Sequence, residues 1–445
     1  MFSSGNHFPS KALEGSLRDF RRSVGSDLLA RCDAFYQWQN LRRRTGTWPF
    51  SRSTEAGPAT FCTVRDDTGR AARGVNFASQ DYLSLSSHPE IKAAAHAAVE
   101  AMGVHSAGSS ALLGNTSSSV ALERRLASFL GMEEALLFPT GWAAGFGVIK
   151  ALVKPSDYIV MDALAHACLI AGAQSATRNV VLYRHLDVNH CRQRLAAIRS
   201  RHPEAGILLV TESLFSMDSD TPDIAALQDL ARIHGATLMV DVAHDLGCLG
   251  ADGTGNIGIQ NMLGHVDLVM GSFSKTFASN GGFVAMRDRA VKEYIRYYNV
   301  AGTFSNALSP VQSAVVTKAL DIIQSAEGAA LRKKLMFNVT LLREHLRERG
   351  MEVHGGPSAI VAVRTGNEGL SRLAARELPG LGLIANLVEF PAVAKDQARF
   401  RMQVMAHHTE EDVAAAADRM GMALAIARGR LEVLTGPVTR FAAAG

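Results

Sequence analysis

From about residue 75 to residue 310, short β-branched apolar runs alternate with segments whose apolar residues recur at helical spacing. The runs that predict strands are EALLFPTG (134–141), DYIVMD (157–162), GILLVTES (206–213), ATLMVDVAH (236–244) and VDLVMGSFSK (266–275). Strands that alternate with helices favour a mostly parallel sheet with helices on both of its faces. The sequence therefore predicts an α/β fold for this part of the chain.

The sequence on either side of this region has a different pattern. Residues 1–74 contain a helical stretch, SDLLARCDAFYQWQNLRRR, and then a connector rich in Gly, Pro, Ser and Thr. After residue 310, a long helical stretch precedes the strand candidates SAIVAVRTG and ARFRMQVMA and a closing helix. We therefore expect three parts, which are a helical arm and connector at 1–74, a large domain at 75–310 and a smaller α+β domain at 311–445.

The composition argues against several classes of protein. The 445 residues are 47% hydrophobic and 20% charged, as in a globular chain, and a net charge of +4 gives little support to nucleic-acid binding. The five cysteines are odd in number and include no CxxC pair, so we interpret them as reduced core thiols of a cytoplasmic protein. No apolar run approaches the roughly 20 residues of a membrane span, and the first residues lack the apolar core of a signal peptide.

Polar residues gather where the predicted strands end. In an open parallel sheet, ligands bind beyond the carboxyl ends of the strands. Each such residue alone has an ordinary structural role, because an Asp often caps a helix and a Lys often lies on the surface. The set at this edge comprises Thr140, Gly141, Trp142, Asp162, His166, Glu212, Asp241, His244, Ser272, Ser274 and Lys275. The combination is harder to explain by structural roles alone.

Pyridoxal phosphate requires this combination of groups. It needs a lysine to form a Schiff base, a carboxylate to keep the pyridinium nitrogen protonated, and amides and hydroxyls to hold its phosphate. Lys275 and Asp241 supply the first two, His166 would lie against the ring, and His244 would lie near the phenolic oxygen. The groups expected to hold the phosphate are Gly141, Trp142, Ser272 and Ser274. We expect no metal site.

A resemblance to a known family covers about residues 75–425. It is carried, in order and spacing, by NFASQDYLSLSSHPEI, PTGWAAG, MDALAHACLIAGA, TESLFSMDSDTPDI, VDVAHDLGCLGADGTG, GSFSKTFASNGGFV, FSNALSP and ARFRMQVMAHHT. These stretches resemble the α-oxoamine synthases, which include serine palmitoyltransferase, aminooxononanoate synthase, 2-amino-3-ketobutyrate ligase and aminolevulinate synthase. Soluble bacterial serine palmitoyltransferases look most similar, and the synthases of autoinducer α-aminoketones look similar as well.

The resemblance implies a fold-type I pyridoxal phosphate transferase with an aspartate aminotransferase-like fold, which is normally a homodimer. Such an enzyme condenses an amino acid with an acyl thioester of coenzyme A or of an acyl carrier protein. It releases carbon dioxide and the free thiol, and its product is an α-aminoketone. Serine is the favoured amino acid, and alanine and glycine are the next choices.

The resemblance also implies roles for the strand-end residues. Lys275 would form the Schiff base and later carry a proton, and Asp241 would pair with the pyridinium nitrogen. His244 would contact the phenolic oxygen of the cofactor. His166 would stack on the ring and steer the substrate carboxylate.

Residues elsewhere in the chain are implicated in the same way. Arg401 would bind the substrate carboxylate through its planar guanidinium, and Arg399 is the alternative. Tyr82 would contact the substrate. Ser305 and Asn306 would reach the phosphate from the neighbouring subunit, so that each active site would be shared between two subunits.

Three positions depart from the family pattern. Ser110, which we expect to contact the substrate, replaces an arginine, and Ser119 replaces a histidine. Both positions lie near the substrate entrance in the family, so an unusual substrate preference would arise there. Val242 replaces an acidic residue next to Asp241, and we interpret it as a buried core residue.

Two other hypotheses stay open. A different fold-type I pyridoxal phosphate enzyme, such as an aminotransferase or a retro-aldol lyase, would use the same cofactor site. Alternatively, the chain is a non-catalytic partner subunit, although such subunits usually lack the lysine that this chain has at position 275. Product analysis separates the two enzymes, because only the condensing enzyme consumes a thioester and releases carbon dioxide.

Overall fold

The computed structural model describes residues 8–435 of the chain. The chain divides into two compact units, a terminal unit of Met1–Ser79 with Phe337–Gly445 and a central unit of Gln80–Met336. The N-terminal segment therefore belongs to the same unit as the C-terminal part, although the whole central unit lies between them in sequence. The three-part division expected from the sequence stays a prediction.

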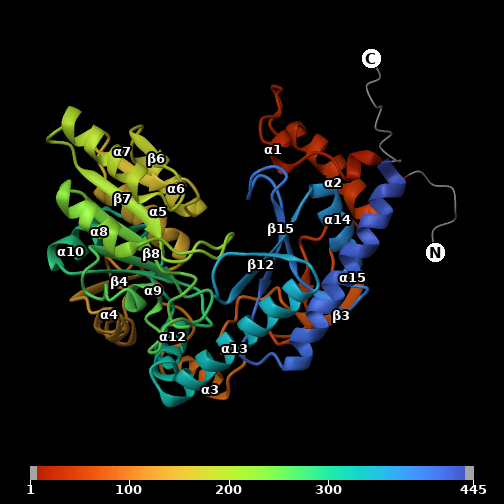
Figure 1. Ribbon diagram of the computed structural model, residues 1–445. Helices are drawn as coiled ribbons and strands as arrows, with labels where there is room; N and C mark the ends of the chain where they lie inside the picture. Colours follow the sequence, from red (N-terminus) through yellow and green to blue (C-terminus); the bar gives the residue numbers. More distant parts are fainter. Residues whose placement is uncertain (1–7, 436–445) are drawn as a thin grey trace. The chain divides into compact units, whose positions relative to one another are not determined.

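The central unit is built on a seven-stranded sheet (Figure 1). Its strands are β4 Glu134–Phe138, β5 Tyr158–Asp162, β6 Val180–Tyr183, β7 Ile207–Glu212, β8 Thr237–Asp241, β9 Leu268–Ser272 and β10 Gly282–Met286. They lie in the order β4-β10-β9-β8-β7-β5-β6, and β10 is antiparallel to both of its neighbours while β5 to β9 run parallel. The predicted mostly parallel sheet and its five predicted strands are confirmed, and β6 and β10 are additions to them.

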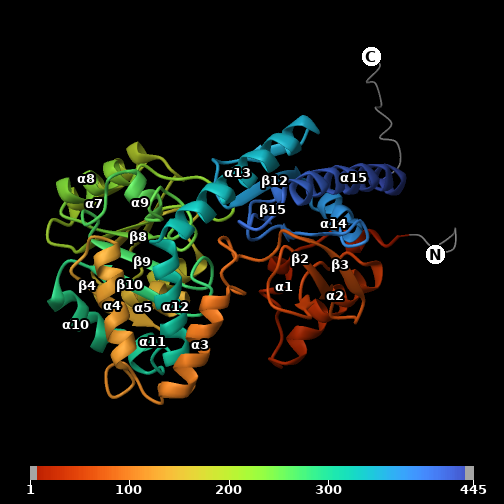
Figure 2. The ribbon, with the colours of Figure 1, turned by 90° about the horizontal axis from the view of Figure 1, so that it is seen from below.

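The helices of the central unit are α3 Pro89–Met102, α4 Ser117–Phe129, α5 Gly141–Leu152, α6 Ala167–Ala176, α7 Val188–Arg201, α8 Ile224–Ile233, α9 Gly255–Ile259, α10 Arg289–Tyr298, α11 Val300–Thr303 and α12 Pro310–Ile323. Helices α5 and α6 pack on one face of the sheet, in an apolar cluster that includes Leu136, Met161 and Met270. Helices α7 and α8 contact β5 and β8, and Figure 2 shows them on the opposite side of the sheet from α5. Every residue of β7 is buried, because helices cover both faces of the sheet at this strand. Figure 2 shows α3 and α12, which are far apart in sequence, side by side.

The described residues of the terminal unit form two four-stranded sheets, in the orders β1-β2-β3-β13 and β11-β12-β15-β14. Their strands are β1 Ser53–Thr54, β2 Phe61–Arg65, β3 Ala71–Asn76, β11 Glu352–His354, β12 Ile360–Gly366, β13 Leu383–Ile384, β14 Asn386–Val388 and β15 Ala398–Gln403. Strands β12 and β15 confirm the two strands predicted near the C-terminus. Strand β13 pairs in parallel with β3, where Leu383 lies opposite Val75. A backbone ladder therefore joins the N-terminal segment to the C-terminal part.

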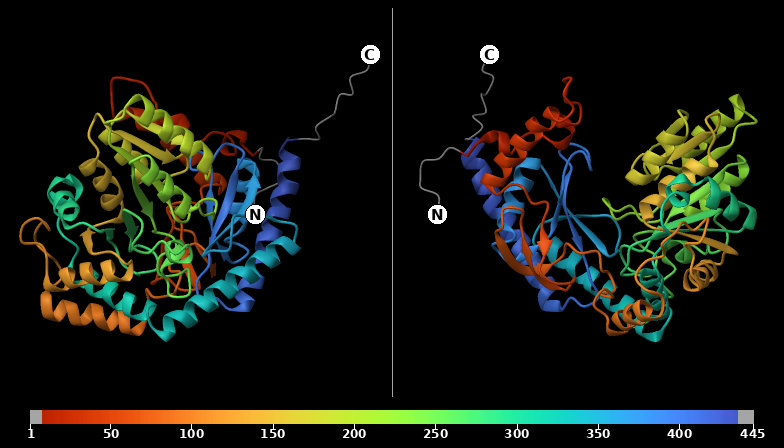
Figure 3. Two further views of the ribbon diagram at one scale, coloured as in Figure 1. Left: turned by 60° about the vertical axis from the view of Figure 1, so that its left-hand side comes forward. Right: turned by 180° about the vertical axis from the view of Figure 1, so that it is seen from behind.

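The helices of the terminal unit are η1 Ser10–Ala12, α1 Leu17–Phe20, η2 Ala30–Cys32, α2 Asp33–Thr45, α14 Glu368–Glu377 and α15 Glu410–Thr435, and α13 Ala326–Glu348 crosses the boundary between the units. Helix α2 confirms the predicted helix of the arm. It is capped by Gly46, whose φ of 71° is the left-handed conformation that glycine adopts without strain. Helix α14 packs on β12 and on α15 (Figure 3).

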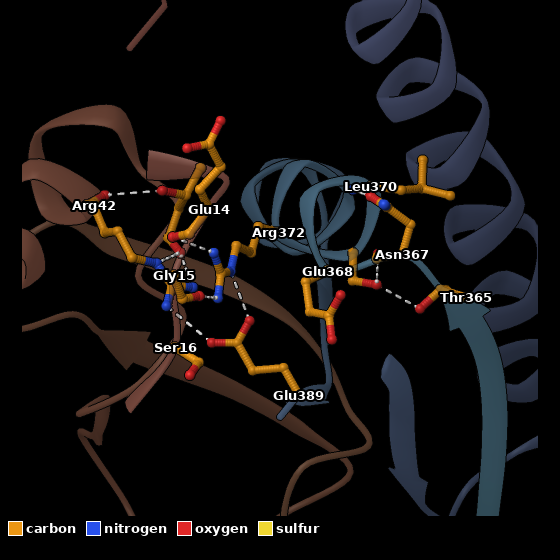
Figure 4. Close-up of polar contacts among 12 residues, drawn as sticks. Glu14, Gly15, Ser16, Arg42, Thr365, Asn367, Glu368, Leu370, Arg372 and Glu389 are labelled. Carbon is orange, nitrogen blue, oxygen red and sulfur yellow. Dashed lines mark hydrogen bonds and ion pairs between the residues drawn. The ribbon is translucent and has the colours of Figure 1, made fainter. Parts of the chain in front are cut away.

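A buried ion cluster fixes the N-terminal segment within the terminal unit (Figure 4). The carboxylate of Glu389 accepts hydrogen bonds from Arg42 at 2.9 Å and from Arg372 at 2.7 Å, and none of the three side chains is more than 4% exposed. Arg372 also donates to the carbonyl oxygens of Glu14 and Gly15, at 3.0 and 2.7 Å. Burial lowers the pKa of Arg42 to about 10, although Glu389 opposes this shift. The cluster therefore depends on the Glu389 charge.

The five cysteines are all free. Cys168, Cys191 and Cys248 are buried, but Cys32 is exposed, so the interpretation of the cysteines as core thiols is wrong for Cys32. Between residues 8 and 435, every helix is too short or too polar to span a bilayer. The cytoplasmic location stays a prediction.

Candidate active site

Two buried carboxyl groups lie next to each other at the carboxyl edge of the central sheet. Glu212 ends β7, Asp241 ends β8, and the parallel register places them opposite each other. Only 4% of Glu212 and 6% of Asp241 is exposed. Burial raises the pKa of both carboxyl groups, and the charge of Asp241 raises that of Glu212 further. Burial raises the pKa of Asp241 and electrostatic interactions with His166 and Lys275 oppose that rise, so both side chains lie within electrostatic reach of it.

His166 lies in the turn between β5 and α6. Its Nδ1 accepts a hydrogen bond from the backbone N–H of Cys168 at 3.3 Å and lies 3.0 Å from the Cys168 thiol. The exposed imidazole lies edge-on to the half-exposed ring of Trp142 on α5, with the ring centroids 6.4 Å apart. Hydrogen bonds at Nδ1 therefore hold the ring at the N-terminus of α6.

The start of α5 approaches the end of β9 closely. A Cβ on Gly141 would lie 2.5 Å from the Cβ of Ser272, and a Cβ on Gly282 would lie 2.6 Å from the Cα of Gly141. Neither position has room for a side chain. Thr140 caps the helix, because its hydroxyl accepts a hydrogen bond from the N–H of Ala143 at 3.0 Å. The first N–H groups of α5 thus meet the Ser272 hydroxyl in a cradle of the kind that binds phosphate.

Lys275 lies in a tight turn that begins where β9 ends. The Ser272 hydroxyl donates to the Ser274 hydroxyl at 3.2 Å and accepts from the Ser274 N–H at 3.3 Å. The N–H of Ala278 donates to the carbonyl of Lys275 at 3.1 Å, and Ala278 has a φ of 53°. Left-handed backbone at a residue other than glycine is strained and persists only where surrounding contacts hold it. The turn therefore delivers the half-buried Lys275 to the edge of the sheet.

His244 lies three residues after Asp241, where it contacts Tyr82. The Tyr82 hydroxyl lies 2.9 Å from Nδ1 of His244, and the two residues are 0% and 7% exposed. A buried hydroxyl at this distance fixes the orientation of the imidazole. The structure thus gives Tyr82 a role in positioning His244. The contact of Tyr82 with the substrate stays a prediction.

Three other predicted residues share one group of loops in the central unit. Ser305 follows α11, and the side chain of the exposed Asn306 lies 3.3 Å from Nε2 of His105. The Ser110 carbonyl accepts a hydrogen bond from Arg296 at 3.4 Å. Contacts of Ser110, Ser305 and Asn306 with cofactor or substrate stay predictions.

The two candidate arginines lie on β15 of the terminal unit. Arg399 and Arg401 are two residues apart, so their side chains share one face of the strand. Arg399 is 4% exposed and donates from Nε to the carbonyl of Gln397 at 3.1 Å, whereas Arg401 is half-buried. The greater exposure of Arg401 favours it as the residue that binds a carboxylate.

Two departures from the family pattern have local explanations. Ser119 and Thr116 form a capping box at the start of α4, in which the Ser119 hydroxyl accepts from the Thr116 N–H at 2.9 Å and the Thr116 hydroxyl accepts from the Ser119 N–H at 3.2 Å. Val242 is 1% exposed, so its interpretation as a core residue is confirmed.

The residues at this edge fit pyridoxal phosphate. The cradle at Gly141 and Ser272 suits a phosphate, and Lys275 supplies an amine for the aldehyde. Two adjacent buried carboxyl groups with raised pKa values favour a cationic partner, which a protonated pyridine nitrogen provides. The planar His166 side chain provides a surface for the ring.

Sequence reasoning missed two contributors to this site. The sequence places Glu212 at a strand end but indicates no role for it, and it predicts Cys168 to be an ordinary core thiol. Burial raises the pKa of Cys168, and the charges of Asp241 and Glu212 add to the shift, so the thiol is neutral beside His166. The position of Glu212 at the last residue of a strand adjacent to the Asp241 strand was a usable signal, whereas nothing in the sequence indicated the contact of Cys168.

The family model described as aminotransferase class I and II matches residues 72–420. The 8-amino-7-oxononanoate synthase of Pelobacter propionicus is 36% identical over 343 residues, which cover 77% of this chain and 86% of the relative. The 2-amino-3-ketobutyrate coenzyme A ligase of Salmonella typhimurium is 34% identical over 359 residues, which cover 79% of this chain and 88% of the relative.

Solved structures extend these similarities over more of the chain. A serine palmitoyltransferase from S. paucimobilis superposes with a TM-score of 0.84 at 26% identity, and the match covers 91% of this chain and 100% of that one. An 8-amino-7-oxononanoate synthase from Francisella tularensis gives a TM-score of 0.66 at 22% identity over 79% of this chain and 98% of that one, which indicates a shared fold.

Proposed function

Because the chain belongs to the α-oxoamine synthases of the aminotransferase class I and II family, we propose that it condenses serine with an acyl thioester. It is a fold-type I acyltransferase whose cofactor is pyridoxal phosphate, and its reaction joins an amino acid to an acyl thioester. The single observation that supports serine is the TM-score of 0.84 with a serine palmitoyltransferase over 91% of the chain. Alanine and glycine are the next candidates. The acyl thioester is that of coenzyme A or of an acyl carrier protein.

The proposed chemistry assigns a task to each residue of the site. Pyridoxal phosphate, when bound, supplies an electron sink for the negative charge that develops on the amino-acid α-carbon. The Lys275 amine holds the cofactor aldehyde and then moves the α-proton, and the Asp241 carboxylate keeps the ring nitrogen protonated. His166 covers one ring face and orients the substrate carboxylate, which the guanidinium of Arg401 binds as a planar pair. His244 donates a hydrogen bond to the phenolic oxygen.

The phosphate is held by groups that the fold places together. The N–H groups of Gly141 and Trp142 begin α5, where the helix dipole favours negative charge, and the hydroxyls of Ser272 and Ser274 add donors. Because a side chain at Gly141 would collide with Ser272, the close approach of helix and strand depends on that glycine. The cradle lies at the same sheet edge as Lys275.

The proposed function is tested by substrate and product analysis. The protein loaded with pyridoxal phosphate is titrated with serine, alanine and glycine while its absorbance spectrum is recorded, and the amino acid that binds is then supplied with acyl-CoA thioesters of several chain lengths. We expect serine to bind most tightly, and one carbon dioxide and one free thiol to appear for each α-aminoketone. Transfer of the amino group to a 2-oxo acid without release of carbon dioxide would instead identify an aminotransferase.

We also propose that two copies of the chain share each active site. The loop that carries Ser305 and Asn306 and the loop between α3 and α4 both expose large apolar side chains, since Phe304 on the first is 85% accessible and Leu112 and Leu113 on the second are 85% and 91% accessible. The Ser109 hydroxyl donates to the Thr303 carbonyl at 2.6 Å, so these loops form one surface. An exposed apolar surface of this kind supports an isologous dimer, in which Ser305 and Asn306 reach the partner's phosphate.

Mixing two inactive variants tests the shared site. We expect Lys275→Ala to lack the amine and Asn306→Trp to bind the cofactor poorly in the partner's site. Random mixing makes half of the dimers mixed, and each mixed dimer has one intact site, so activity should return to about a quarter of the wild-type level. Each variant expressed alone is the control. Verified mixed dimers without activity would show that the site is not shared in this way.

A further inference from the structure

We propose that His185 is a positioning residue that holds the His166 turn of the active site by joining the Asp162 carboxylate at the end of β5 to the Asp220 carboxylate in the loop after β7. His185 follows β6, outside the motifs that we assigned to the cofactor. Its Nδ1 lies 2.8 Å from the Asp162 carboxylate, and its Nε2 lies 3.1 Å from the Asp220 carboxylate. The imidazole therefore connects the carboxyl ends of three adjacent strands, β7, β5 and β6.

Asp162 organises the turn that leads to His166. Its carboxylate is fully buried, and besides His185 it accepts the N–H of Leu164 at 2.9 Å and the N–H of Leu186 at 3.0 Å. The Leu164 bond closes the turn from β5 toward His166. A buried carboxylate without a cationic partner is strongly unfavourable, so His185 allows this turn to be built around a charge.

Asp220 holds the loop that follows Glu212. The N–H of Phe215 donates to the carbonyl of Asp220 at 2.9 Å, which closes this loop on itself. The ring of Phe215 also packs edge-on against His185, with centroids 4.5 Å apart. Burial raises the pKa of Glu212, and a backbone hydrogen bond from His166 to the Glu212 carboxylate opposes that rise, so the His166 turn and the β7 strand end are in contact. His185 therefore hydrogen-bonds both to the end of β5, which leads to His166, and to the loop that follows Glu212, and these two segments meet at the active site.

The charge of His185 and the backbone conformation of the next residue both indicate that its hydrogen bonds to Asp162 and Asp220 are strong. Partial burial lowers the pKa of His185, but hydrogen bonds to Asp162 and Asp220 outweigh burial and raise the pKa to about 10. A cation between two carboxylates gives hydrogen bonds that are stronger than neutral ones. The next residue, Leu186, has a φ of 57°, a strained conformation that the bond to Asp162 helps to maintain.

The test uses His185→Gln, whose single amide group cannot donate to both carboxylates. In the cofactor-free protein, we expect hydrogen exchange to become faster at residues 163–166, at Leu186 and at residues 214–221, and to stay unchanged in the rest of the central unit. In the protein loaded with pyridoxal phosphate, we expect the dissociation constant of serine to rise about tenfold, as for the loss of one well-placed hydrogen bond. Cofactor affinity should fall less than serine affinity, since the phosphate cradle and Lys275 are built on other elements.

Two variants of Asp220 keep the test decisive if His185→Gln folds poorly. Asp220→Ala removes one anchor and should show the same localised effect on exchange and serine binding, whereas Asp220→Asn keeps an acceptor for Nε2 and should restore nearly wild-type values. His202→Gln, at an exposed histidine in the same unit, is the control. Uniformly faster exchange, or unchanged serine binding in His185→Gln and Asp220→Ala, would overturn the proposal.

The positioning role of His185 rests on the proposed role of His166 in orienting the amino acid. One further variant, His166→Ala, distinguishes a failure of the His166 role from a failure of the His185 role. If His166→Ala leaves the serine dissociation constant unchanged, the role of His166 itself is wrong. If His166→Ala weakens serine binding but His185→Gln does not, the role of His166 stands and the positioning role of His185 is refuted.

Discussion

Replacing Lys275 with alanine is expected to lower turnover by about 10³-fold or more while the protein still folds. The proton transfer that we assign to this amine contributes on the order of 10²–10⁴-fold in enzymes, and loss of the cofactor attachment adds to the effect. The half-buried Lys275 side chain lies in a turn held by backbone and serine hydrogen bonds, so its truncation leaves those bonds in place. Turnover is measured as thiol released from an acyl-CoA in the presence of serine.

The same variant tests the placement of the active site. Borohydride should fix the cofactor to the wild-type chain on the peptide that contains Lys275, and it should fix none to Lys275→Ala. Lys92→Ala, at an exposed lysine on α3, serves as the control and should retain wild-type turnover and labelling. A labelled peptide with a different lysine would show that the sheet edge has been assigned the wrong chemistry.

Replacing Glu389 with glutamine is expected to lower the free energy of unfolding of the terminal unit by about 3–5 kcal/mol, the usual cost of removing one partner from a buried ion pair. The substitution preserves the shape of the side chain but leaves Arg42 and Arg372 buried without a counter-charge. Urea unfolding followed by tryptophan fluorescence reports on this region, because the guanidinium carbon of Arg42 lies 4.8 Å from the centroid of the Trp38 ring and 5.2 Å from that of Trp48.

The matched control is Glu348→Gln in the same unit. Its side chain is 68% exposed, and exposed ion pairs contribute about 0–1 kcal/mol. We therefore expect its unfolding midpoint to stay close to that of the wild type. If Glu389→Gln and Glu348→Gln have equal effects, the buried cluster does not hold the N-terminal segment as the structure suggests.

Much of the cofactor site was predictable because its residues lie at the ends of strands that the sequence marks clearly. Asp241 stands at the end of one apolar run, and Lys275 comes a few residues after the end of another. In a parallel sheet, the ends of such runs meet at one edge. The fit of Gly141 against Ser272 could only be suspected, since it depends on β10 entering the sheet between β4 and β9 with glycine at its start.

The amino-acid sequence by itself determined the strands, the order of the motifs and the residue types available for chemistry, because hydrophobic periodicity and turn residues act over a few neighbouring positions. Only the tertiary structure decided which distant segments meet. The pairing of β3 with β13 joins the N-terminal segment to the C-terminal part, and the bonds of His185 to Asp162 and Asp220 connect the ends of three adjacent strands. These contacts depend on strand order and register, which local patterns do not encode, so the residues that brace the site became visible only in the fold.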